Sequence, residues 1–334
     1  MCGISGIYQI KDVNNKLKQA VDFMNQSQIN RGPDDSGIFI NEKRGIGLGH
    51  QRLSIIDLSK KGKQPMGFND IWITYNGEIY NFLELKKDLK EKGCKFATKT
   101  DTEVILALYL EYGEMSFAML RGMFAFGLWD GKKQKLFLVK DRYGIKPLYY
   151  YSDKEKLIFA STVKAITKSG LVSVKNNPQA LIGFLLFGSV PLPMTTVRDV
   201  FAVPAGHYLV RNADGQQKII QYYDPLVFYQ HKSAENQHES APIEIRQLLE
   251  ESVNLHLISD APLGIFLSGG LDSSALAALA AQIIRNQHKS TKIGVNQRLT
   301  TLSVVFKEKE FSEKKYQDLV VKKIGSEHRE IKIT

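Results

Sequence analysis

Short hydrophobic runs, rich in β-branched and aromatic side chains and bounded by Gly, Asp, Asn and Lys, recur through residues 3–160. This pattern is typical of strands. It predicts strands at 3–8, 45–51, 71–75, 124–130, 135–140, 148–151 and 157–160, with a hairpin around Asp130 and Gly131. Between them, hydrophobic residues at helical spacing predict helices at 14–25, 83–92 and 101–111. Strands interspersed with a few helices predict an α+β domain with packed antiparallel sheets.

The second half of the chain has a different pattern. Residues 177–210 are hydrophobic but interrupted by glycine and proline, which indicates a connector packed on a core, and the polar residues 229–241 indicate a surface loop or linker. Strands and helices then alternate, with helices predicted at 243–259, 273–287 and 312–324 and strands at 264–267, 301–306 and 329–333. Such alternation predicts a parallel sheet. Because a doubly wound sheet commonly has about five or more strands, we expect this α/β domain to be C-terminally incomplete.

Composition narrows the class of protein. Hydrophobic residues make up 43% and charged residues 24% of the 334, which excludes disorder throughout. The net charge is +10, but the lysines are scattered in short clusters, which favours a solvated surface and no nucleic-acid partner. No hydrophobic run approaches the roughly 20 residues of a membrane span, so we expect no membrane partner. The two cysteines, Cys2 and Cys94, cannot form a disulfide framework, and we expect a cytoplasmic protein.

Cys2 is the first candidate for chemistry. Cysteine is small enough for the initiator methionine to be removed, which would leave Cys2 with a free α-amine. A terminal cysteine combines a nucleophilic thiol with an amine that can take its proton. The alternative is an incidental cysteine at this position. A catalytic role for Cys2 therefore requires other residues suited to the same reaction.

The segments around Arg52 and Asn76 supply what the hydrolysis of a carboxamide needs. Attack on the amide creates an oxyanion, and the Asn76 side chain beside the Gly77 N–H could stabilise it. Arg52 could clamp the α-carboxylate of glutamine, and Glu78 and Asp101 could hold its α-ammonium. The alternatives are a hairpin turn at Asn76 and Gly77, and a surface ion pair for Arg52.

Other candidates for chemistry are weaker. We expect His50 to be a packed or hydrogen-bonded residue rather than a catalyst, and Cys94 to be a bystander thiol. The seven histidines show no metal-binding spacing.

A second strong signal lies at residues 266–274, where a hydrophobic strand leads through Ser-Gly-Gly into a helix. Glycines let the backbone approach a phosphate closely, and a helix N-terminus offers unpaired N–H groups and the positive end of its dipole. The Gly-Lys-Ser/Thr ending of a Walker A loop is absent. Simple helix capping by a Ser or Asp is the alternative, but the strand before and the helix after favour phosphate binding.

Six motifs occur in order along the first half of the chain: CGISG at 2–6, RGPDDSG at 31–37, HQRLS at 50–54, YNGEIYN at 75–81, TDTE at 100–103 and DRYGIKPLY at 141–149. Together they resemble the class II glutamine amidotransferase domain of the glutamine-hydrolysing asparagine synthetases. Residues 266–274 resemble the pyrophosphate loop of the ATP pyrophosphatases, and the resemblance covers essentially the whole chain. It implies an α+β N-terminal-nucleophile hydrolase sandwich at 2–210, a connector at 211–241 and a partial α/β parallel-sheet ATP-pyrophosphatase (asparagine synthetase) domain at 242–334.

The resemblance also implies roles for the residues at matching positions. Cys2 would be the nucleophile, with Asn76 and Gly77 forming the oxyanion hole. Glutamine would be bound by Arg52, Leu53, Ile55, Asn76, Gly77, Glu78 and Asp101. The nucleotide would be bound by Leu267, Ser268, Gly269, Gly270, Asp272, Ser273 and Val305, with Asp272 as a ligand of Mg²⁺. The motifs at 31–37 and 141–149 look architectural.

The implied activity is glutamine-dependent asparagine synthesis, in which ATP, aspartate, glutamine and water give asparagine, glutamate, AMP and pyrophosphate. Cys2 would release the ammonia, the partners would be these small molecules, and the protein would be a homodimer. The family's second acidic loop and its aspartate-binding residues have no counterpart in this chain. The alternatives are an amidotransferase with another carboxylate acceptor, a truncated glutaminase, and a silent glutamine-binding regulatory fragment.

Overall fold

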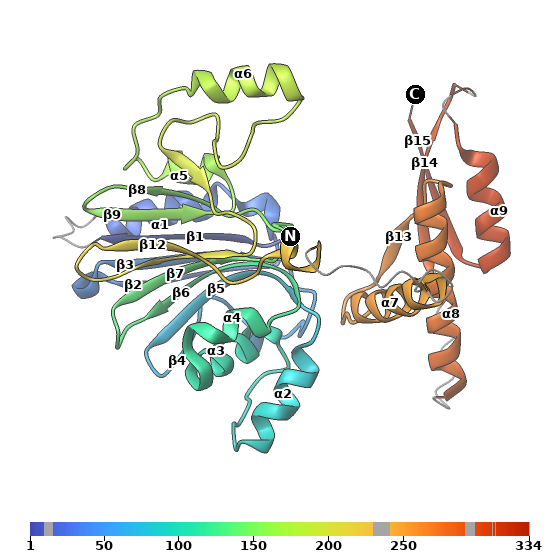
Figure 1. Ribbon diagram of the computed structural model, residues 1–334, viewed down its shortest axis with the longest axis horizontal. Helices are drawn as coiled ribbons and strands as arrows, with labels where there is room; N and C mark the ends of the chain where they lie inside the picture. Colours follow the sequence, from blue (N-terminus) through green and yellow to red (C-terminus); the bar gives the residue numbers. More distant parts are fainter. Residues whose placement is uncertain (10–15, 230–240, 291–297, 309, 311, 334) are drawn as a thin grey trace. The chain divides into compact units, whose positions relative to one another are not determined.

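The chain forms two compact units, Met1–Gln230 and His231–Thr334, in the computed structural model. The structure describes residues 1–9, 16–229, 241–290, 298–308, 310 and 312–333. In the first unit, two six-stranded sheets with antiparallel strand pairs lie face to face between helices, and the second unit holds a three-stranded parallel sheet (Figure 1). These arrangements confirm the predicted sandwich and the predicted parallel sheet. The predicted helix start at Asn14 and most of the predicted linker at 229–241 lie outside the described residues.

Strand order defines the two sheets of the first unit. The first sheet runs β10 (Val200–Ala202), β8 (Tyr149–Ser152), β9 (Lys156–Ala160), β1 (Gly3–Gln9), β3 (Ile46–Arg52) and β2 (Asp35–Asn41). The second sheet runs β12 (Gln217–Gln221), β11 (His207–Arg211), β7 (Lys135–Lys140), β6 (Gly122–Asp130), β5 (Ile71–Ile79) and β4 (Met66–Phe68). Both β1 and β5 therefore lie inside their sheets, with a neighbour on each side.

Helices cover the outer faces of both sheets (Figure 1). The first sheet is covered by α1 (Leu17–Gln26) and α5 (Val163–Lys168), and the second by α3 (Asp101–Tyr112) and α4 (Ser116–Met119). Helix α2 (Phe82–Glu91) packs against α3. Between the sheets, Ile4, Leu48, Trp129 and Phe159 belong to one fully buried cluster. Hydrophobic side chains of α1 and α5 form another cluster with Ile7 of β1. Strand β1 is thus buried on both of its faces.

Several elements differ from the sequence prediction. Strand β5 runs from Ile71–Ile79 and so continues through Asn76 and Gly77, which excludes a hairpin turn there. Strands β2 and β4 were not predicted. Residues 177–210, predicted as a packed connector, contain helix α6 (Pro178–Phe187) as well as β10 and β11. Strand β12 pairs with β11 within the residues that we expected to be a connector.

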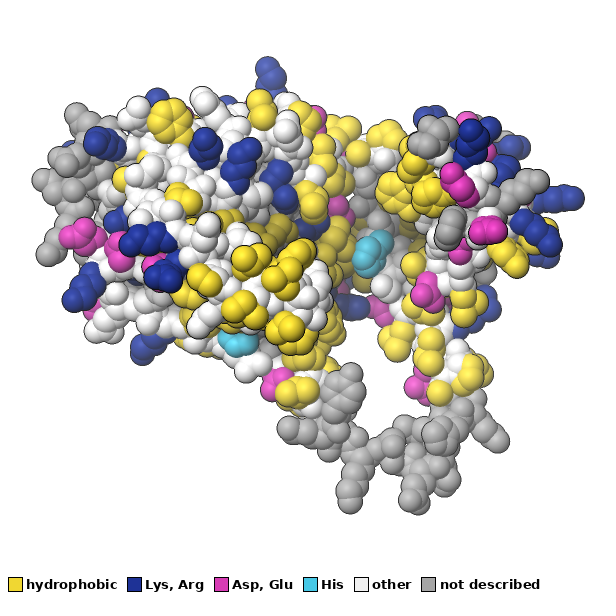
Figure 2. Space-filling model, turned by 90° about the horizontal axis from the view of Figure 1, so that it is seen from above, with side chains coloured by type: hydrophobic (Ala, Val, Ile, Leu, Met, Phe, Trp, Pro, Cys, Tyr) yellow, Lys and Arg dark blue, Asp and Glu magenta, His cyan; other side chains and the backbone are white. Residues whose placement is uncertain are grey.

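Helix α6 also corrects the expectation that this segment packs on a core. Leu185, Leu186 and Phe187 are each more than 70% exposed, and Figure 2, which views the molecule from above, shows hydrophobic side chains gathered over this helix. The helix has regular ends, because the Asn177 side chain accepts a hydrogen bond from the Ala180 N–H and a glycine with positive φ follows the last turn. Its ends are therefore set locally, while most of its hydrophobic surface lies in solvent.

Where the structure describes the second unit, three helices lie around its parallel sheet. The sheet runs β13 (Gly264–Phe266), β14 (Thr300–Phe306) and β15 (Glu327–Ile333), and the helices are α7 (Ala241–His256), α8 (Leu271–Ser290) and α9 (Lys314–Ile324). Alanines of α8 pack against hydrophobic residues of the sheet and of the other two helices. Within the described ranges, no helix combines the length and the apolar character that crossing a bilayer requires.

His50 is buried in the first unit and joins its two sheets. It lies on β3 and is fully buried, and its Nδ1 lies 3.1 Å from the hydroxyl of Thr74 on β5. Because that hydroxyl donates to the Gly49 carbonyl, it can only accept from His50, which places the proton on Nδ1. Burial lowers the pKa of His50 to about 3. The expectation that His50 is a packed, hydrogen-bonded residue is confirmed.

We predict that His50 makes the first unit less stable in acid. Below its ordinary pKa of 6.5 the unfolded chain protonates His50, whereas the folded chain does so only near pH 3, so stability falls as the pH drops through that window. At pH 5 the neutral, buried His50 lowers the free energy of unfolding by about 2 kcal/mol. Urea unfolding followed by the fluorescence of the two tryptophans, both in the first unit, measures it. His50→Gln should flatten the pH dependence of the free energy of unfolding between pH 4 and 7. His207→Gln, the control at a partly exposed histidine, should leave that dependence unchanged. An equal slope in both variants would contradict the assignment.

Candidate active site

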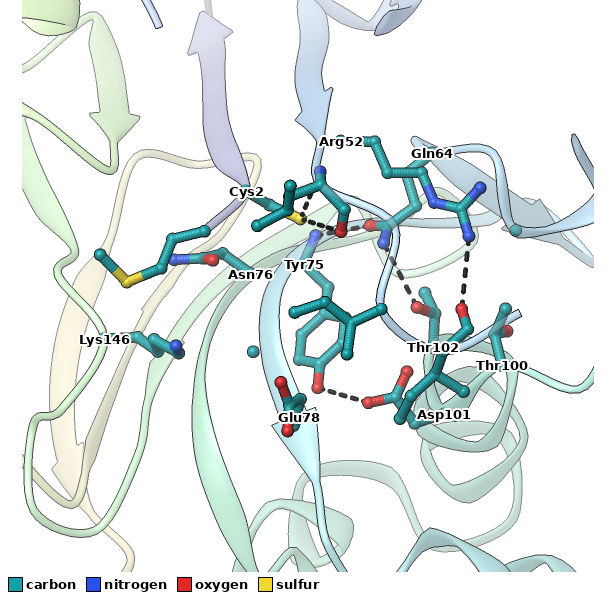
Figure 3. Close-up of a pocket in the computed structure, with 16 residues that line it drawn as sticks. Cys2, Arg52, Gln64, Tyr75, Asn76, Glu78, Thr100, Asp101, Thr102 and Lys146 are labelled. Carbon is teal, nitrogen blue, oxygen red and sulfur yellow. Dashed lines mark hydrogen bonds between the residues drawn. The ribbon is translucent and has the colours of Figure 1, made fainter. Parts of the chain in front are cut away.

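One cavity of the first unit gathers the two residues that precede β1 with residues from β3, β5, α3 and the loops beside them (Figure 3). Its wall includes all the residues that the sequence assigned to the thiol and glutamine site: Cys2, Arg52, Leu53, Ile55, Asn76, Gly77, Glu78 and Asp101. The remaining wall residues are Met1, Ile56, Gly62, Gln64, Tyr75, Thr100, Thr102 and Lys146. The predicted set is therefore brought together from positions up to 99 residues apart in the chain, Cys2 and Asp101.

Cys2 precedes β1 and is held by the residue that follows β3. Its Sγ lies 3.4 Å from the N–H of Leu53 and 3.6 Å from the carbonyl of the same residue. The Arg31 Nε donates to the carbonyl of Cys2 at 3.0 Å. Burial raises the pKa of the Cys2 thiol, and the Leu53 N–H, the N-terminal ammonium of Met1 and Arg52 act in the opposite direction. The backbone of Cys2 is thus fixed while its sulfur faces the cavity.

Asn76 and Gly77 lie in the middle of β5, opposite Ala125 and Phe124 of β6. Gly77 has no room for a side chain, because a Cβ there would stand 2.3 Å from the Met123 carbonyl oxygen. The Asn76 side chain is 1% exposed, and among the described residues its Nδ2 has no hydrogen-bond partner. Figure 3 shows this side chain beside Cys2. A buried amide donor left open is costly unless a ligand uses it, so Asn76 is suited to bind a negatively charged oxygen.

Arg52 is a buried residue at the end of β3. Its guanidinium donates to the carbonyls of Ser59 at 3.0 Å and Ile56 at 3.4 Å, and also to that of Asp57. Gly62 leaves room for this group, since a Cβ there would lie 2.1 Å from one guanidinium nitrogen. The alternative of a surface ion pair is therefore excluded. The loop after β3 wraps the guanidinium and fixes it in the wall of the cavity.

Asp101 occupies the first turn of α3, where Thr100 caps the helix by accepting from the Glu103 N–H. One Asp101 carboxylate oxygen accepts from the Tyr75 hydroxyl at 2.7 Å and from the Ile79 N–H at 3.0 Å. Burial raises the pKa of Asp101, and these two hydrogen bonds oppose the rise. Glu78 is the second carboxylate of the wall and is only half-buried. The cavity therefore presents two carboxylates on the side of β5 and α3.

Sequence reasoning missed several residues of the wall. Gln64 bridges Tyr75 and Thr102, because its amide oxygen accepts from the Tyr75 N–H at 2.8 Å and its nitrogen donates to the Thr102 hydroxyl at 3.3 Å. Nothing in the local sequence marks Gln64 as a wall residue. Lys146 does lie in a motif that the sequence singled out, at 141–149, but that motif was interpreted as architectural.

The Ser-Gly-Gly segment of the second unit forms a loop between β13 and α8. The Ser268 hydroxyl lies 2.8 Å from that of Ser273, and it accepts from the Gly270 N–H at 3.2 Å. Gly269 has a φ of +92°, which favours glycine. Gln317 of α9 donates to the Ser268 carbonyl at 3.2 Å. The loop is thus shaped by hydroxyl and amide contacts at the start of a 20-residue helix.

The other residues assigned to nucleotide binding lie around this loop. Leu267 is buried, and its backbone N–H donates to the Leu302 carbonyl at 2.8 Å. Val305 is buried near the end of the neighbouring strand β14. Asp272 is exposed in the first turn of α8. In the part of the chain that the structure describes, no three His, Cys, Asp or Glu side chains group as a metal site would require.

Comparison with known proteins identifies the family of the chain. Residues 1–223 match the model of the glutamine amidotransferase domain, and residues 244–334 match that of asparagine synthase. The glutamine-hydrolysing asparagine synthetase 1 of Bacillus subtilis (strain 168) is 37% identical over 321 residues, which are 94% of this chain and 47% of that protein. The amidase chry2 of Gibberella zeae is 36% identical over 310 residues, which are 88% of this chain and 44% of that protein.

The chain thus spans about half the length of these curated relatives. Among solved structures, the glutamine phosphoribosylpyrophosphate amidotransferase of Bacillus subtilis covers 99% of this chain with a TM-score of 0.50. The match extends over 81% of that structure at 16% identity, a level at which it supports the fold alone. By sequence and by architecture, the chain belongs to the glutamine amidotransferase domain family, followed by a region that matches asparagine synthase.

Proposed function

We propose that this chain releases ammonia from glutamine at Cys2. The observation that carries the proposal is the open Nδ2 donor of Asn76, buried in the same cavity wall as the Cys2 sulfur. Attack of a thiolate on a carboxamide moves negative charge onto the carbonyl oxygen, and a fixed donor beside the nucleophile stabilises that charge. The Gly77 backbone N–H is the second donor in this proposal.

The chemistry proceeds in two steps. The Cys2 thiolate bonds to the side-chain carbonyl carbon of glutamine, and the C–N bond breaks as ammonia leaves with a proton. Water then hydrolyses the γ-glutamyl thioester, which gives glutamate and returns the thiol. Removal of Met1 would leave the Cys2 α-amine beside the sulfur, where it can take the thiol proton and later give it to the leaving nitrogen.

The rest of the wall matches the ends of a glutamine molecule. Arg52 would bind the α-carboxylate, and Glu78 and Asp101 would bind the α-ammonium. Leu53 and Ile55 would shape the site through their backbone groups. The Tyr75 hydroxyl and the Ile79 N–H both engage one oxygen of Asp101, and in this proposal the ligand's ammonium interacts with the other. Opposite charges at the two ends of the cavity would select a free amino acid over a simple amide.

We further propose that the ammonia is used to amidate aspartate at the expense of ATP, with AMP and pyrophosphate as products. The support is the match of residues 244–334 to asparagine synthase and the Ser268–Ser273 loop at the start of α8. Backbone N–H groups at a helix N-terminus suit a pyrophosphate. Leu267, Gly269, Gly270 and Val305 would complete this nucleotide site. Asp272 offers carboxylate oxygens, the ligand type that Mg²⁺ takes, and bound Mg²⁺ would offset the charge of the pyrophosphate. The proposal also includes a cytoplasmic homodimer.

A second candidate is an amidotransferase of the same architecture with another acceptor. It is favoured by one observation, the 36% identity to the amidase chry2 over 88% of this chain. Glutamine labelled with ¹⁵N at the amide discriminates the two in the presence of ATP. Label in asparagine when aspartate is supplied supports the first candidate, whereas label in the amide of a different acid supports the second.

Cys2→Ala is expected to lower the release of glutamate from glutamine by about 10³-fold or more, because the covalent intermediate can no longer form. The matched control is Cys94→Ala, which removes the other free thiol, outside the cavity, and should retain the activity of the parent. The measurement is glutamate formed over time. Undiminished hydrolysis in Cys2→Ala would refute the mechanism.

Asn76→Ala is expected to lower kcat for glutamine hydrolysis by about 10²- to 10³-fold with a much smaller change in KM, because the donor acts on charge that develops in the transition state. Asn76→Asp keeps the shape of the side chain, loses the Nδ2 donor, and should be as slow. Steady-state kinetics measure both. A kcat within about threefold of the parent, or an effect confined to KM, would remove Asn76 from the oxyanion hole.

A further inference from the structure

Lys146 is a buried cation in the wall of the cavity that holds Cys2. Its side chain is turned into this cavity (Figure 3), and the residue is only 7% exposed. Among the residues that the structure describes, none forms a hydrogen bond or an ion pair with its ammonium group. A lysine in this position is unusual, because a charged amine taken out of water is costly unless an anion faces it.

The loop that carries Lys146 is built around one carboxylate. Asp141 is fully buried and accepts hydrogen bonds from the backbone N–H groups of Tyr143, Ile145 and Lys146 at 2.9–3.1 Å. It also accepts from the N–H of Phe124 on β6 at 3.2 Å. Four donors on one side chain fix the course of the loop, so the ammonium is directed into the cavity by the fold.

Two groups that can carry negative charge act on this ammonium from within the cavity. Burial lowers the pKa of Lys146, whereas Glu78 and then Cys2 raise it. Outside the cavity wall, Arg31 lowers this pKa and Asp141 raises it to a smaller extent. Glu78 is a half-buried carboxylate of the cavity wall, and Cys2 becomes an anion when its thiol ionises. The ammonium and the thiolate therefore favour each other, because each lowers the cost of the other's charge in a poorly solvated site.

We propose that Lys146 is a positioning residue that stabilises the thiolate of Cys2, a role that rests on the function proposed above for the same site. Ionisation transfers the thiol proton to the N-terminal amine or to water, and the charge left on sulfur lies in the field of the buried ammonium. The nucleophile of this reaction is the thiolate, so Lys146 acts on the rate through the fraction of Cys2 that is ionised.

The other charged groups near Cys2 differ from Lys146. Arg52 uses its guanidinium N–H groups on three carbonyl oxygens of its own loop, and Arg31 donates to the carbonyl of Cys2. The N-terminal ammonium favours the thiolate, and Asp101 opposes it. Arg31 also has a buried guanidinium nitrogen with no partner among the described residues, but it does not line the cavity. Lys146 differs from these cations because it lines the cavity and no backbone oxygen of the described residues engages its ammonium.

The test is the pH dependence of Cys2 alkylation by iodoacetamide. It is measured in a Cys94→Ala background, so that Cys2 is the thiol that reacts. Lys146→Met removes the charge with little change in size, and should raise the apparent pKa of Cys2 by about one unit and slow alkylation at pH 7 about tenfold. Lys146→Arg should stay close to the parent. Lys140→Met is the matched control, since Lys140 is a second buried lysine, 5% exposed, outside the cavity wall, and it should leave the titration unchanged.

Identical titration of the parent and the folded Lys146→Met variant would overturn the proposal, as would a Lys146→Arg variant shifted as far as Lys146→Met. Thermal unfolding reports whether each variant is folded, and Lys146→Gln serves as a second neutral variant if Lys146→Met is not. Glutamate release is measured separately. If Lys146→Met shifts the pKa of Cys2 but the parent does not hydrolyse glutamine, the proposed function is refuted and this inference is supported. Slower hydrolysis in Lys146→Met with an unchanged pKa of Cys2 would support the proposed function and refute this inference.

Discussion

Strand β1 lies between β3 and β9, and its antiparallel register with β3 pairs Gly3 with Gln51. The next residues along each strand, Cys2 and Arg52, therefore meet at the same end of the sheet, with the Leu53 backbone in contact with the sulfur. This register cannot slip, because the side chains of β1 are buried on both faces. A shift by one residue would exchange the side chains that face the second sheet with those that face the helices. The whole cavity is thus built on a strand pairing that hydrophobic burial determines.

The polar groups of the cavity fall into two classes. Those with fixed partners are Arg52, held by three carbonyl oxygens, and Asp101, held by the Tyr75 hydroxyl and a backbone N–H. Among the described residues, the Nδ2 of Asn76 and the ammonium of Lys146 have no hydrogen-bond partner, and both are donors. In a site of low dielectric, open donors attract charge that develops during a reaction more strongly than they would in water. The arrangement therefore favours anions that form at Cys2 and on the substrate carbonyl over the neutral groups from which they form.

The sequence predicts those site residues and elements whose pattern lies within a short stretch of the chain. Cys2, Arg52 and Asp101 lie in short motifs, so their assembly into one cavity was expected. Asn76 was also expected there, although its dipeptide with Gly77 is typical of a turn, and only pairing with β6 shows that the strand continues. Helix α6 was missed because Gly188, which ends it, was interpreted as one of several interruptions of a connector, and Pro178 was not recognised as the first residue of a helix. Proline at the start and glycine just after the end are common helix signals. The position of the Lys146 ammonium depends on Asp141, which accepts hydrogen bonds from N–H groups of its own loop and from that of Phe124 on β6, an arrangement that no sequence pattern records.

The two candidate sites differ in how far their donors are committed before a ligand binds. In the loop of the second unit, the hydroxyls of Ser268 and Ser273 lie within hydrogen-bond distance of each other, and the Gly270 N–H donates to Ser268. A pyrophosphate that bound to these groups would have to replace those bonds, so each gain would be offset by a loss. Within the described ranges the Nδ2 of Asn76 has no such bond to give up, and binding an oxyanion there would satisfy a donor that burial leaves unpaired. By this argument the thiol site is preformed, whereas the nucleotide loop would exchange internal hydrogen bonds for those of its ligand.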